Sequence, residues 1–512
     1  MPEAERTVSH PMLLSDDAHD AALLANTRPP GWKNPTPAAS YNLVVLGGGT
    51  AGLVTAAGAA GLGAKVALVE KALLGGDCLT FGCVPSKALL RAARFYTDLR
   101  DAPRYTGSAP MPSPADFTAV MHRMRRIRAH IGRHDSTRRF QTLGVDVFLG
   151  EAAFRDRRTV EVDGAVLHFK KAVIATGSRA ARPPIVGLDD AGYLTNETVF
   201  NLTERPRRLL VIGGGPLGCE FAQAFARLGC QVIIANREPY FLPGEERDAA
   251  EILANALRRD GIEVRLNTEV QSVTQGDGEK YVRLLNDTNE STVVVDEILA
   301  GIGRVPNIDG LNLEAAGVTY DRENGVRVND FLQTSNRRIY AAGDVTLERK
   351  YTHMADATAR IVIQNALFLG RKRLSALTIP WCTYTDPEIA HVGLYVKECQ
   401  ERGFPLKTFT VPMSDVDRAV LDGEEAGFVK IHVHEGTDTI LGATIVARHA
   451  GEMINEISLA MVAGIGLKTV SQVIHSYPTQ AEAIRKAADA YTRTRLSPFL
   501  KSLSRRWLAW SR

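Results

Sequence analysis

The 512-residue sequence has no run of eighteen apolar residues, which excludes a transmembrane helix. It has almost no net charge, because 61 basic and 58 acidic residues leave only +3, so no general excess of charge favours nucleic acid. Cysteine is scarce, with six residues, too few for a disulfide scaffold. Residues 1–40 show neither the apolar core of a signal peptide nor the acid-poor character of a transit peptide. These absences predict a cytoplasmic protein with a polar N-terminal arm over residues 1–40.

The composition that is present, 45% hydrophobic and 23% charged, is that of a folded globular protein. A chain of this length exceeds one ordinary core and is expected to form about three or four domains. Its densest basic stretch is residues 122–139, where arginine recurs at helical spacing among apolar residues. We expect a helix there whose charged face lies in solvent, in preference to a surface for nucleic acid.

An internal repeat is the strongest signal in the chain. Residues 41–71 align without a gap with residues 207–237, and eleven of the 31 positions are identical. Each copy has an apolar strand, a G-x-G-x-x-G turn, an alanine-rich helix and a second apolar strand, which is the βαβ context that binds dinucleotides. In such a turn a pyrophosphate approaches the amides at a helix N-terminus. The glycines concerned are Gly47, Gly49 and Gly52 in the first copy and Gly213, Gly215 and Gly218 in the second.

The residue that ends the second strand differs between the copies. At this position, where an acid grips a ribose 2′-hydroxyl, the first copy has Glu70 and the second has Asn236, followed by Arg237. A carboxylate would repel a 2′-phosphate, whereas Asn236 does not and Arg237 can pair with one. The second site is therefore predicted to prefer NADPH, with NADH possible. The alternative is that Arg237 simply lies in solvent.

Two cysteines lie close together in GGDCLTFGCVPSKALLR, residues 75–91. On one straight helix Cys78 and Cys83 would be too far apart for a disulfide, so the pair is expected to straddle a turn into a helix. Gly82 can supply the bend and Pro85 suits the first helical turn, which puts Cys83 at the helix N-terminus, where a thiolate is stabilised. A zinc site would need two more ligands nearby. A redox disulfide is favoured over a metal site and over a structural staple, and no metal is predicted.

Together these segments resemble the flavin-dependent pyridine nucleotide-disulfide oxidoreductases, the family of glutathione reductase, dihydrolipoamide dehydrogenase and mercuric reductase. The segment GGDCLTFGCVPSK is similar to the active-site segment of the family, and the likeness extends from residue 41 to about 495. Further matching segments are AVIATGS (172–178), GIGRVPN (301–307), IYAAGD (339–344) and YTDPEIAHVG (384–393).

The resemblance implies an α/β fold with two Rossmann-like dinucleotide-binding domains and a C-terminal α+β dimerisation domain that closes a homodimer. It implies FAD on residues 41–185 and 305–375, a nicotinamide cofactor on residues 186–304 and the subunit interface on residues 376–495. Beyond the glycine turns, the residues assigned to FAD are Glu70, Lys71, Gly177 and Asp344, with Asp344 on the ribityl chain. Those assigned to NADPH are Asn236, Arg237 and Gly303.

The resemblance also implies a role for one charged pair. Alignment of the repeats puts Glu220 where the first copy has Val54, on a helix face that ought to be buried, and a buried carboxylate without a partner is costly. Lys87, four residues after Cys83, is the cation that the family sets against such a glutamate beside the flavin, unless both charges reach solvent. Electrons are then implied to pass from NADPH through FAD to Cys83, the flavin-side sulfur, and to Cys78, which attacks the substrate.

Near its C-terminus the chain departs from the disulfide-reducing members, which use a His directly before a Pro and a Glu five residues after that His. Here HSYPTQAE, residues 475–482, has Tyr477 at the base position, with Glu482 in place. Tyrosine, with a pKa of about 10, is a poor proton shuttle at neutral pH. His475 lies two residues away, about 7 Å along an extended segment, and is expected to be a bystander.

A tyrosine at this position resembles mercuric reductase. However, the last cysteine is Cys399, and residues 1–40 contain none, so we find neither the C-terminal cysteine pair nor the metal-binding N-terminal domain of that enzyme. The expected function is an oxidoreductase that passes electrons from NADPH to a small disulfide, quinone or soft metal ion. Mercuric or copper ion reduction and dihydrolipoamide dehydrogenation are the alternatives.

Residues 496–512 are predicted to form a basic amphipathic helix. Its apolar stripe and the basic residues off that stripe are Phe499, Leu500, Leu503, Trp507 and Trp510, and Lys501, Arg505 and Arg506. The pattern is typical of a helix lying on an anionic membrane. Packing on the partner subunit is the favoured interpretation. Peripheral contact with the inner membrane face, by a flavoprotein adaptor with little turnover, is the alternative from another functional class.

Overall fold

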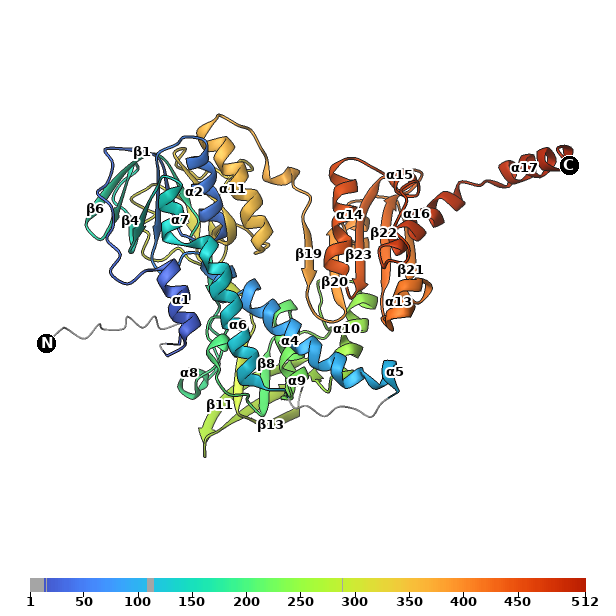
Figure 1. The fold of residues 1–512 in the computed structure, drawn as a ribbon, viewed down its shortest axis with the longest axis horizontal. Helices are drawn as coiled ribbons and strands as arrows, with labels where there is room; N and C mark the ends of the chain where they lie inside the picture. Colours follow the sequence, from blue (N-terminus) through green and yellow to red (C-terminus); the bar gives the residue numbers. More distant parts are fainter. Residues whose placement is uncertain (1–12, 15, 108–114, 288) are drawn as a thin grey trace. The chain divides into compact units, whose positions relative to one another are not determined.

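The computed structural model describes residues 13–14, 16–107, 115–287 and 289–512 (Figure 1). The chain divides into two compact units, one of Met1–Arg237 with Asn267–Leu377 and one of Glu238–Leu266 with Thr378–Arg512. The predicted nicotinamide domain, residues 186–304, is therefore shared between the units.

The first unit contains a sheet built on the first repeat. Its strands in chain order are β1 (Tyr41–Leu46), β2 (Val66–Glu70), β3 (Val145–Leu149), β4 (Ala152–Phe154), β5 (Thr159–Val162), β6 (Ala165–Ile174) and β18 (Ile339–Ala341). Their order is β3-β2-β1-β6-β5-β4, with β18 also paired to β6. The pairs β1–β2, β2–β3, β1–β6 and β6–β18 are parallel, and Val45 lies between Leu68 and Val173. β1 and β2 are almost wholly buried, as apolar strands are when both sheet faces are covered.

The second repeat builds a second parallel sheet in this unit. Its strands are β8 (Arg208–Ile212), β9 (Gln231–Ala235) and β14 (Glu297–Ala300), with β8 between the other two. Leu210 of β8 pairs with Ile233 on one side and Ile298 on the other. In the first sheet β5 runs antiparallel to β4 and β6. Further antiparallel pairs are β7 (Ser178–Ala180) with β15 (Arg304–Pro306), β11 (Thr268–Gly276) with β12 (Glu279–Asn286) and β13 (Asn289–Val295), and β16 (Tyr320–Asp321) with β17 (Gly325–Val326).

Helices of the first unit carry most of the predicted site residues. α2 (Thr50–Gly61) packs on α11 (Thr352–Leu367), and α4 (Cys83–Asp101) packs on α6 (Phe117–Gly132) and α9 (Pro216–Arg227). The βαβ order predicted for both repeats is confirmed. The other α-helices described in this unit are α1 (Ala18–Thr27), α3 (Gly76–Thr80), α5 (Pro103–Thr106), α7 (Thr137–Thr142) and α8 (Leu188–Ala191).

The prediction of a solvated charged face over residues 122–139 is wrong for two arginines of α6. Arg125 and Arg128 are only 4% and 0% exposed. Helical spacing does not indicate which stripe meets a neighbouring element, and α1 packs on this one (Figure 1). Arg125 donates to the carbonyl oxygens of Phe200 and Leu202 at 3.2 and 2.9 Å. The predicted polar arm thus contains a docked helix.

The second unit holds an antiparallel sheet in the order β19-β20-β23-β22-β21. Its strands are β19 (Pro380–Thr383), β20 (Glu388–Gly393), β21 (Leu406–Pro412), β22 (Phe428–His434) and β23 (Ile440–Ala447). The helices and the short strand of this unit are α10 (Arg247–Arg259), β10 (Glu263–Arg265), α12 (Val396–Glu401), α13 (Asp417–Asp422), α14 (Ala450–Val462), α15 (Leu467–Val470), α16 (Glu482–Thr494) and α17 (Pro498–Trp510). α14 and α16 pack on the sheet and complete an apolar core that includes Ile445, Ile457 and Ile484.

Polar side chains explain why residues 238–266 group with this unit. Glu245 accepts hydrogen bonds from Trp381 Nε1 at 3.3 Å and from Tyr395 Oη at 2.7 Å. Glu246 accepts one from Lys430 Nζ at 2.9 Å. Among the described residues, no helix is both long and apolar enough to cross a membrane.

Candidate active site

The two glycine turns have the same backbone geometry. Gly47 and Gly213, which end β1 and β8, have φ values of 106° and 101°, in the region that favours glycine. A Cβ on Gly52 would lie 1.7 Å from the carbonyl oxygen of Gly47, and one on Gly218 would lie 2.1 Å from that of Gly213. The third glycine of each motif is therefore required for the close approach of helix to strand.

The middle glycines leave the helix N-termini open. Gly49 and Gly215 are the N-caps of α2 and α9. The nearest atom to a Cβ on Gly49 would be 3.8 Å away, on Gly76, and nothing lies within 4 Å of one on Gly215. Backbone amides at the start of each helix are thus free of steric cover and fit a pyrophosphate, which both FAD and a nicotinamide dinucleotide carry.

The residues predicted to grip a ribose also hold the glycine turns. Glu70 accepts hydrogen bonds from the amides of Gly48 and Ala72 at 2.5 and 2.6 Å, and burial raises the pKa of its carboxyl group. Asn236 Oδ1 accepts from the equivalent amide, that of Gly214, at 3.1 Å. Both side chains are buried, whereas the residues that follow them, Lys71 and Arg237, are exposed.

The cysteine pair straddles a turn between two helices, as predicted. Cys78 lies in the short helix α3, Gly82 is the N-cap of α4, and Cys83 is its first residue. The two thiols lie close enough to share a hydrogen bond and to shift each other's pKa values. The hydroxyl of Thr352, at the start of α11, lies 3.3 Å from Cys83 Sγ.

This arrangement shifts the pKa values of the two thiols in opposite directions. The hydrogen bond from Cys78 lowers the pKa of Cys83 to about 6, and the hydroxyl of Thr352 and the charge of Lys87 act in the same direction. The same hydrogen bond, together with burial, raises the pKa of Cys78. When the pair shares one proton, these shifts therefore favour the proton on Cys78 and the negative charge on Cys83.

The predicted charged pair joins α4, which follows the first repeat, to α9, the helix of the second repeat. Lys87 Nζ of α4 donates to Glu220 Oε2 of α9 at 2.7 Å. Glu220 is only 5% exposed, so its carboxylate is held by a cation rather than by water. Because Lys87 is one turn from Cys83, this ion pair lies at the end of α4 that bears the sulfurs.

Two segments that match the family separately pair with each other in space. β7, in the ATGS segment, runs antiparallel to β15, in the GRVPN segment. The glycines of these segments, Gly177 and Gly303, have φ values of 71° and 116°, and a Cβ on either would meet nothing within 4 Å. Their exposed backbone offers further room for a ligand.

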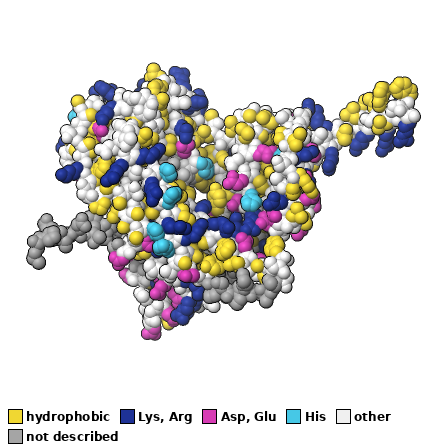
Figure 2. Space-filling model, viewed as in Figure 1, with side chains coloured by type: hydrophobic (Ala, Val, Ile, Leu, Met, Phe, Trp, Pro, Cys, Tyr) yellow, Lys and Arg dark blue, Asp and Glu magenta, His cyan; other side chains and the backbone are white. Residues whose placement is uncertain are grey.

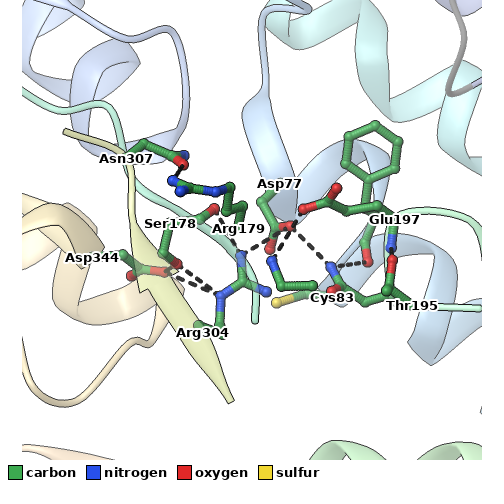
Figure 3. A network of polar contacts seen from close by, with 12 residues as sticks. Asp77, Cys83, Ser178, Arg179, Thr195, Glu197, Arg304, Asn307 and Asp344 are labelled. Atoms are coloured by element: carbon green, nitrogen blue, oxygen red, sulfur yellow. Dashed lines mark hydrogen bonds and ion pairs between the residues drawn. The ribbon is translucent and has the colours of Figure 1, made fainter. Parts of the chain in front are cut away.

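Arg304 of β15 stands between two carboxylates (Figure 3). Its Nε donates to Ser178 Oγ at 2.7 Å and lies 3.8 Å from Asp344, and Ser178 donates to Asp344 at 2.7 Å. Its Nη2 lies 3.2 Å from Asp77, which also accepts a hydrogen bond from Asn196 at 3.1 Å. Burial raises the pKa of Asp344. The carboxylate predicted for the ribityl chain is thus linked to the one that directly precedes Cys78.

Sequence reasoning did not single out Thr352, Asp77 or Arg304. Thr352 reaches the sulfurs from 269 residues away in the chain, and no local spacing signals such a contact. Arg304 lies inside a segment that matches the family, but its partners follow only from the pairing of β15 with β7. Asp77 had a local signal, namely a charge next to the attacking cysteine.

The residues predicted for proton transfer lie in the second unit. Tyr477 is 69% exposed and donates to Asp417 Oδ2 at 2.8 Å, which raises the pKa of its phenol. His475 is held by Glu456 at 3.0 Å and by the carbonyl oxygen of Val473 at 3.1 Å. Glu482 begins α16. In the described part of the chain, no three His, Cys, Asp or Glu side chains gather in a way that could hold a metal ion.

Comparison with known families agrees with these motifs. Residues 41–360 match the family described as pyridine nucleotide-disulphide oxidoreductase, and residues 379–488 match the dimerisation domain of that family. The chain belongs to the pyridine nucleotide-disulphide oxidoreductases. The resemblance, the fold class and the enzyme class predicted from the sequence are confirmed, and FAD and NAD(P)H are the cofactors of this family.

The similar proteins carry names of different activities. The chain is 34% identical to mercuric reductase of Lysinibacillus sphaericus, over 88% of this chain and 82% of that one. It is 33% identical to dihydrolipoyl dehydrogenase of Bacillus subtilis (strain 168), over 88% and 98%. Among solved structures, the HOCl-induced flavoprotein disulfide reductase RclA of Escherichia coli has a TM-score of 0.79 at 28% identity, over 88% and 99%. RclA has also been solved as a Cu(II) complex.

Proposed function

We propose that this oxidoreductase passes electrons from NADPH through Cys78 and Cys83 to a small acceptor, either a disulfide, a quinone or a soft metal ion. The observation that carries the proposal is the asymmetric thiol pair at the start of α4, one turn from the Lys87–Glu220 ion pair. Bound FAD would accept a hydride from NADPH and pass the two electrons on to the cysteine pair. Gly47, Gly49 and Gly52 would seat its pyrophosphate, and Glu70, Lys71, Gly177 and Asp344 complete the proposed FAD site.

Reduction of the Cys78–Cys83 disulfide gives the protonation state that the site favours. The disulfide accepts two electrons and one proton, the S–S bond breaks, and the products are the Cys83 thiolate and the Cys78 thiol. Thr352 and Lys87 stabilise the thiolate, while Cys78, once deprotonated, is the sulfur that attacks the acceptor. Lys87 and Glu220 hold a fixed charge beside the proposed flavin site.

Choice of NADPH rests on the second repeat. Gly213, Gly215, Gly218 and Gly303 would seat the nicotinamide dinucleotide. Asn236 places no negative charge at the ribose position, and the exposed Arg237 can pair with a 2′-phosphate. A clear preference for NADH in steady-state rates would contradict this part of the proposal.

Tyr477 narrows the range of possible electron acceptors. Its hydrogen bond to Asp417 raises the pKa of the phenol, so proton relay of the kind that a histidine provides is disfavoured. Relatives named mercuric reductase and a structural neighbour solved with Cu(II) make Hg(II) and Cu(II) reasonable acceptors, because thiolates bind soft ions. Tyr477 and Glu482 would act from the partner subunit of a homodimer, and the enzyme would be cytoplasmic.

An anaerobic NADPH titration of the FAD-loaded protein tests the electron path. We expect a long-wavelength charge-transfer band in the wild type that is absent in Cys83→Ser and retained in the matched control Cys399→Ser, whose thiol is buried in the other unit. A wild type without the band would overturn the proposal. Competition among Hg(II), Cu(II), quinones, low-molecular-weight disulfides and lipoyl compounds for the reduced enzyme then identifies the acceptor.

α17 supports a second proposal, peripheral binding to an anionic membrane. Its apolar side chains gather on one face and its Lys and Arg residues on the opposite face (Figure 2), and none of its residues is buried. Residues 490–512 contain no acid, so both faces suit the interface of an anionic bilayer. Deletion of residues 496–512 should abolish sedimentation with phosphatidylserine vesicles. If the deletion instead leaves sedimentation unchanged and dissociates the dimer, α17 packs on the partner subunit.

A further inference from the structure

α1 lies before residue 41, where the family match begins, yet it is anchored in the fold. Asp17 caps the helix by accepting hydrogen bonds from the amides of His19 and Asp20 at 2.8 and 3.1 Å. Leu23, at its centre, is fully buried. A helix outside the matched region that buries its central residues has a structural task there.

The task is indicated by a buried ion pair. Arg128 of α6 has one guanidinium nitrogen, Nη2, 2.5 Å from Asp20 Oδ1, and both side chains are almost completely buried. Its other nitrogen, Nη1, donates to the carbonyl oxygen of Thr80 at 2.8 Å. Thr80 lies between the two redox cysteines, so a single planar guanidinium links α1 to the backbone of the redox segment.

An apolar contact repeats this link. Leu23 of α1 and Leu79, the residue directly after Cys78, belong to one buried cluster with Leu13, Leu73 and Ala129. A Cβ on Gly132 of α6 would lie 2.5 Å from Leu23 Cδ1 and 3.6 Å from Leu79 Cδ2. The end of α6 therefore packs against a leucine of α1 and a leucine of the redox segment.

The C-terminal end of α1 ties down the connection that leads to the cysteines. The carbonyl oxygen of Thr27 accepts a hydrogen bond from the amide of Leu74 at 3.3 Å. Arg28 donates to the carbonyl oxygens of Lys71 and Ala72, both at 2.9 Å. The backbone before Cys78 is thus bound directly by residues at the end of α1. The backbone between the cysteines is bound by Arg128, which Asp20 of α1 holds.

We infer that α1 is a clamp that positions the Cys78–Cys83 segment, and that Asp20, Arg128 and Leu23 are its positioning residues. None of the three touches a sulfur. A held segment keeps the two sulfurs close, which favours the disulfide and keeps the hydrogen bond from Cys78 on Cys83. Release of the clamp should therefore make the disulfide easier to reduce and the Cys83 thiolate less stable. The inference rests on the proposed redox role of the pair.

The test is the thiol–disulfide equilibrium of the FAD-loaded enzyme in dithiothreitol buffers, measured by alkylation of Cys78 and Cys83 and peptide mass analysis. We expect Asp20→Asn to shift the equilibrium towards the dithiol about tenfold, which corresponds to about +30 mV for a two-electron couple. The pH midpoint of the charge-transfer band should rise as well. A merely stabilising contact would lower the melting temperature without moving either quantity.

Asp17→Asn is the matched control. Asparagine still caps α1, while the substitution removes the ion pair with Arg125, 3.6 Å away, whose guanidinium holds the carbonyl oxygens of Phe200 and Leu202 and not the redox segment. This variant should keep the wild-type equilibrium within twofold. An equal shift in both variants, or no shift in folded Asp20→Asn, overturns the clamp.

A second variant covers the case in which Asp20→Asn does not fold around FAD. Leu23→Ala leaves every charge in place and removes only apolar packing in the cluster that contains Leu79. It should shift the equilibrium in the same direction, and an unchanged equilibrium overturns the inference. A wild-type pair that equilibrates with dithiothreitol but is not reduced by NADPH would instead refute the proposed function and leave the clamp to be judged by the variants.

Discussion

The first repeat, β1–α2–β2, and the second, β8–α9–β9, hold their glycine turns by the same means. In each, the first glycine has a φ near 100°, the third leaves no room for a Cβ, and a buried side chain from the end of the second strand accepts a hydrogen bond from the middle of the turn. The side chain is Glu70 in one copy and Asn236 in the other. At the position after the turn where the first copy has Val54, the second has Glu220, which binds Lys87.

This comparison separates what builds a dinucleotide site from what makes it specific. The first and third glycines of each motif are identical in the two copies because backbone geometry requires them. The residues proposed to determine cofactor choice and charge lie at positions where the copies differ. At each such position, the residue of one copy can be substituted by the residue of the other. Such exchanges change charge while the fold of the turn is kept.

The largest effect is expected for alanine at the third glycine. Gly52→Ala would set a Cβ 1.7 Å from a backbone oxygen of the first repeat, which only a shift of the turn can relieve, so we expect a loss of stability above about 4 kcal/mol. FAD content after purification and the melting temperature measure it. Gly218→Ala is the matched change in the second repeat and should retain FAD but lose NADPH binding. Equal FAD loss in both would show that the repeats do not divide the cofactors as proposed.

Next in size is Glu220→Val, which gives the second repeat the residue of the first. Lys87 then loses its partner beside the proposed flavin site, and the rate of flavin reduction by NADPH in a stopped-flow experiment should fall about a hundredfold. Glu220→Gln, which keeps an oxygen for Lys87 Nζ, should lose less. If both variants reduce at the wild-type rate, the ion pair is structural only.

A smaller change is expected for Asn236→Glu, which copies Glu70. Because Glu70 accepts the hydrogen bond of its own turn, a glutamate at 236 should accept that of Gly214 and keep the turn intact. Its charge should repel a 2′-phosphate, so the ratio of kcat/KM for NADPH to that for NADH should fall about tenfold. An unchanged ratio would mean that the 2′-phosphate does not approach this position.

The sequence predicts local contacts of the site better than contacts between distant parts of the chain. The two repeats, the start of α4 at Cys83 and the pairing of Lys87 with Glu220 were predictable, because they depend on local pattern, on self-alignment or on the family motif. The contacts of Thr352 with Cys83 and of Arg304 with Asp77 were not, because tertiary structure alone brings these residues together. Arg128 was placed in solvent for the same reason, since its pattern does not reveal that α1 covers it.

The smallest effect concerns the Cys83 thiolate and separates the charge of Lys87 from the hydrogen bond of Cys78. With a pKa of about 6 for Cys83, the charge-transfer band of the reduced enzyme should be complete at pH 8 and disappear as the pH falls through 6, because protonation removes the donor. The hydrogen bond from Cys78 is the largest cause of the low pKa, and the charge of Lys87 contributes less. Lys87→Met should therefore raise the midpoint by less than about one pH unit, since one unit already corresponds to about 1.4 kcal/mol. Cys78→Ala should raise it further. The reverse order would make the ion pair between the repeats, and not the partner sulfur, the main stabiliser of the thiolate.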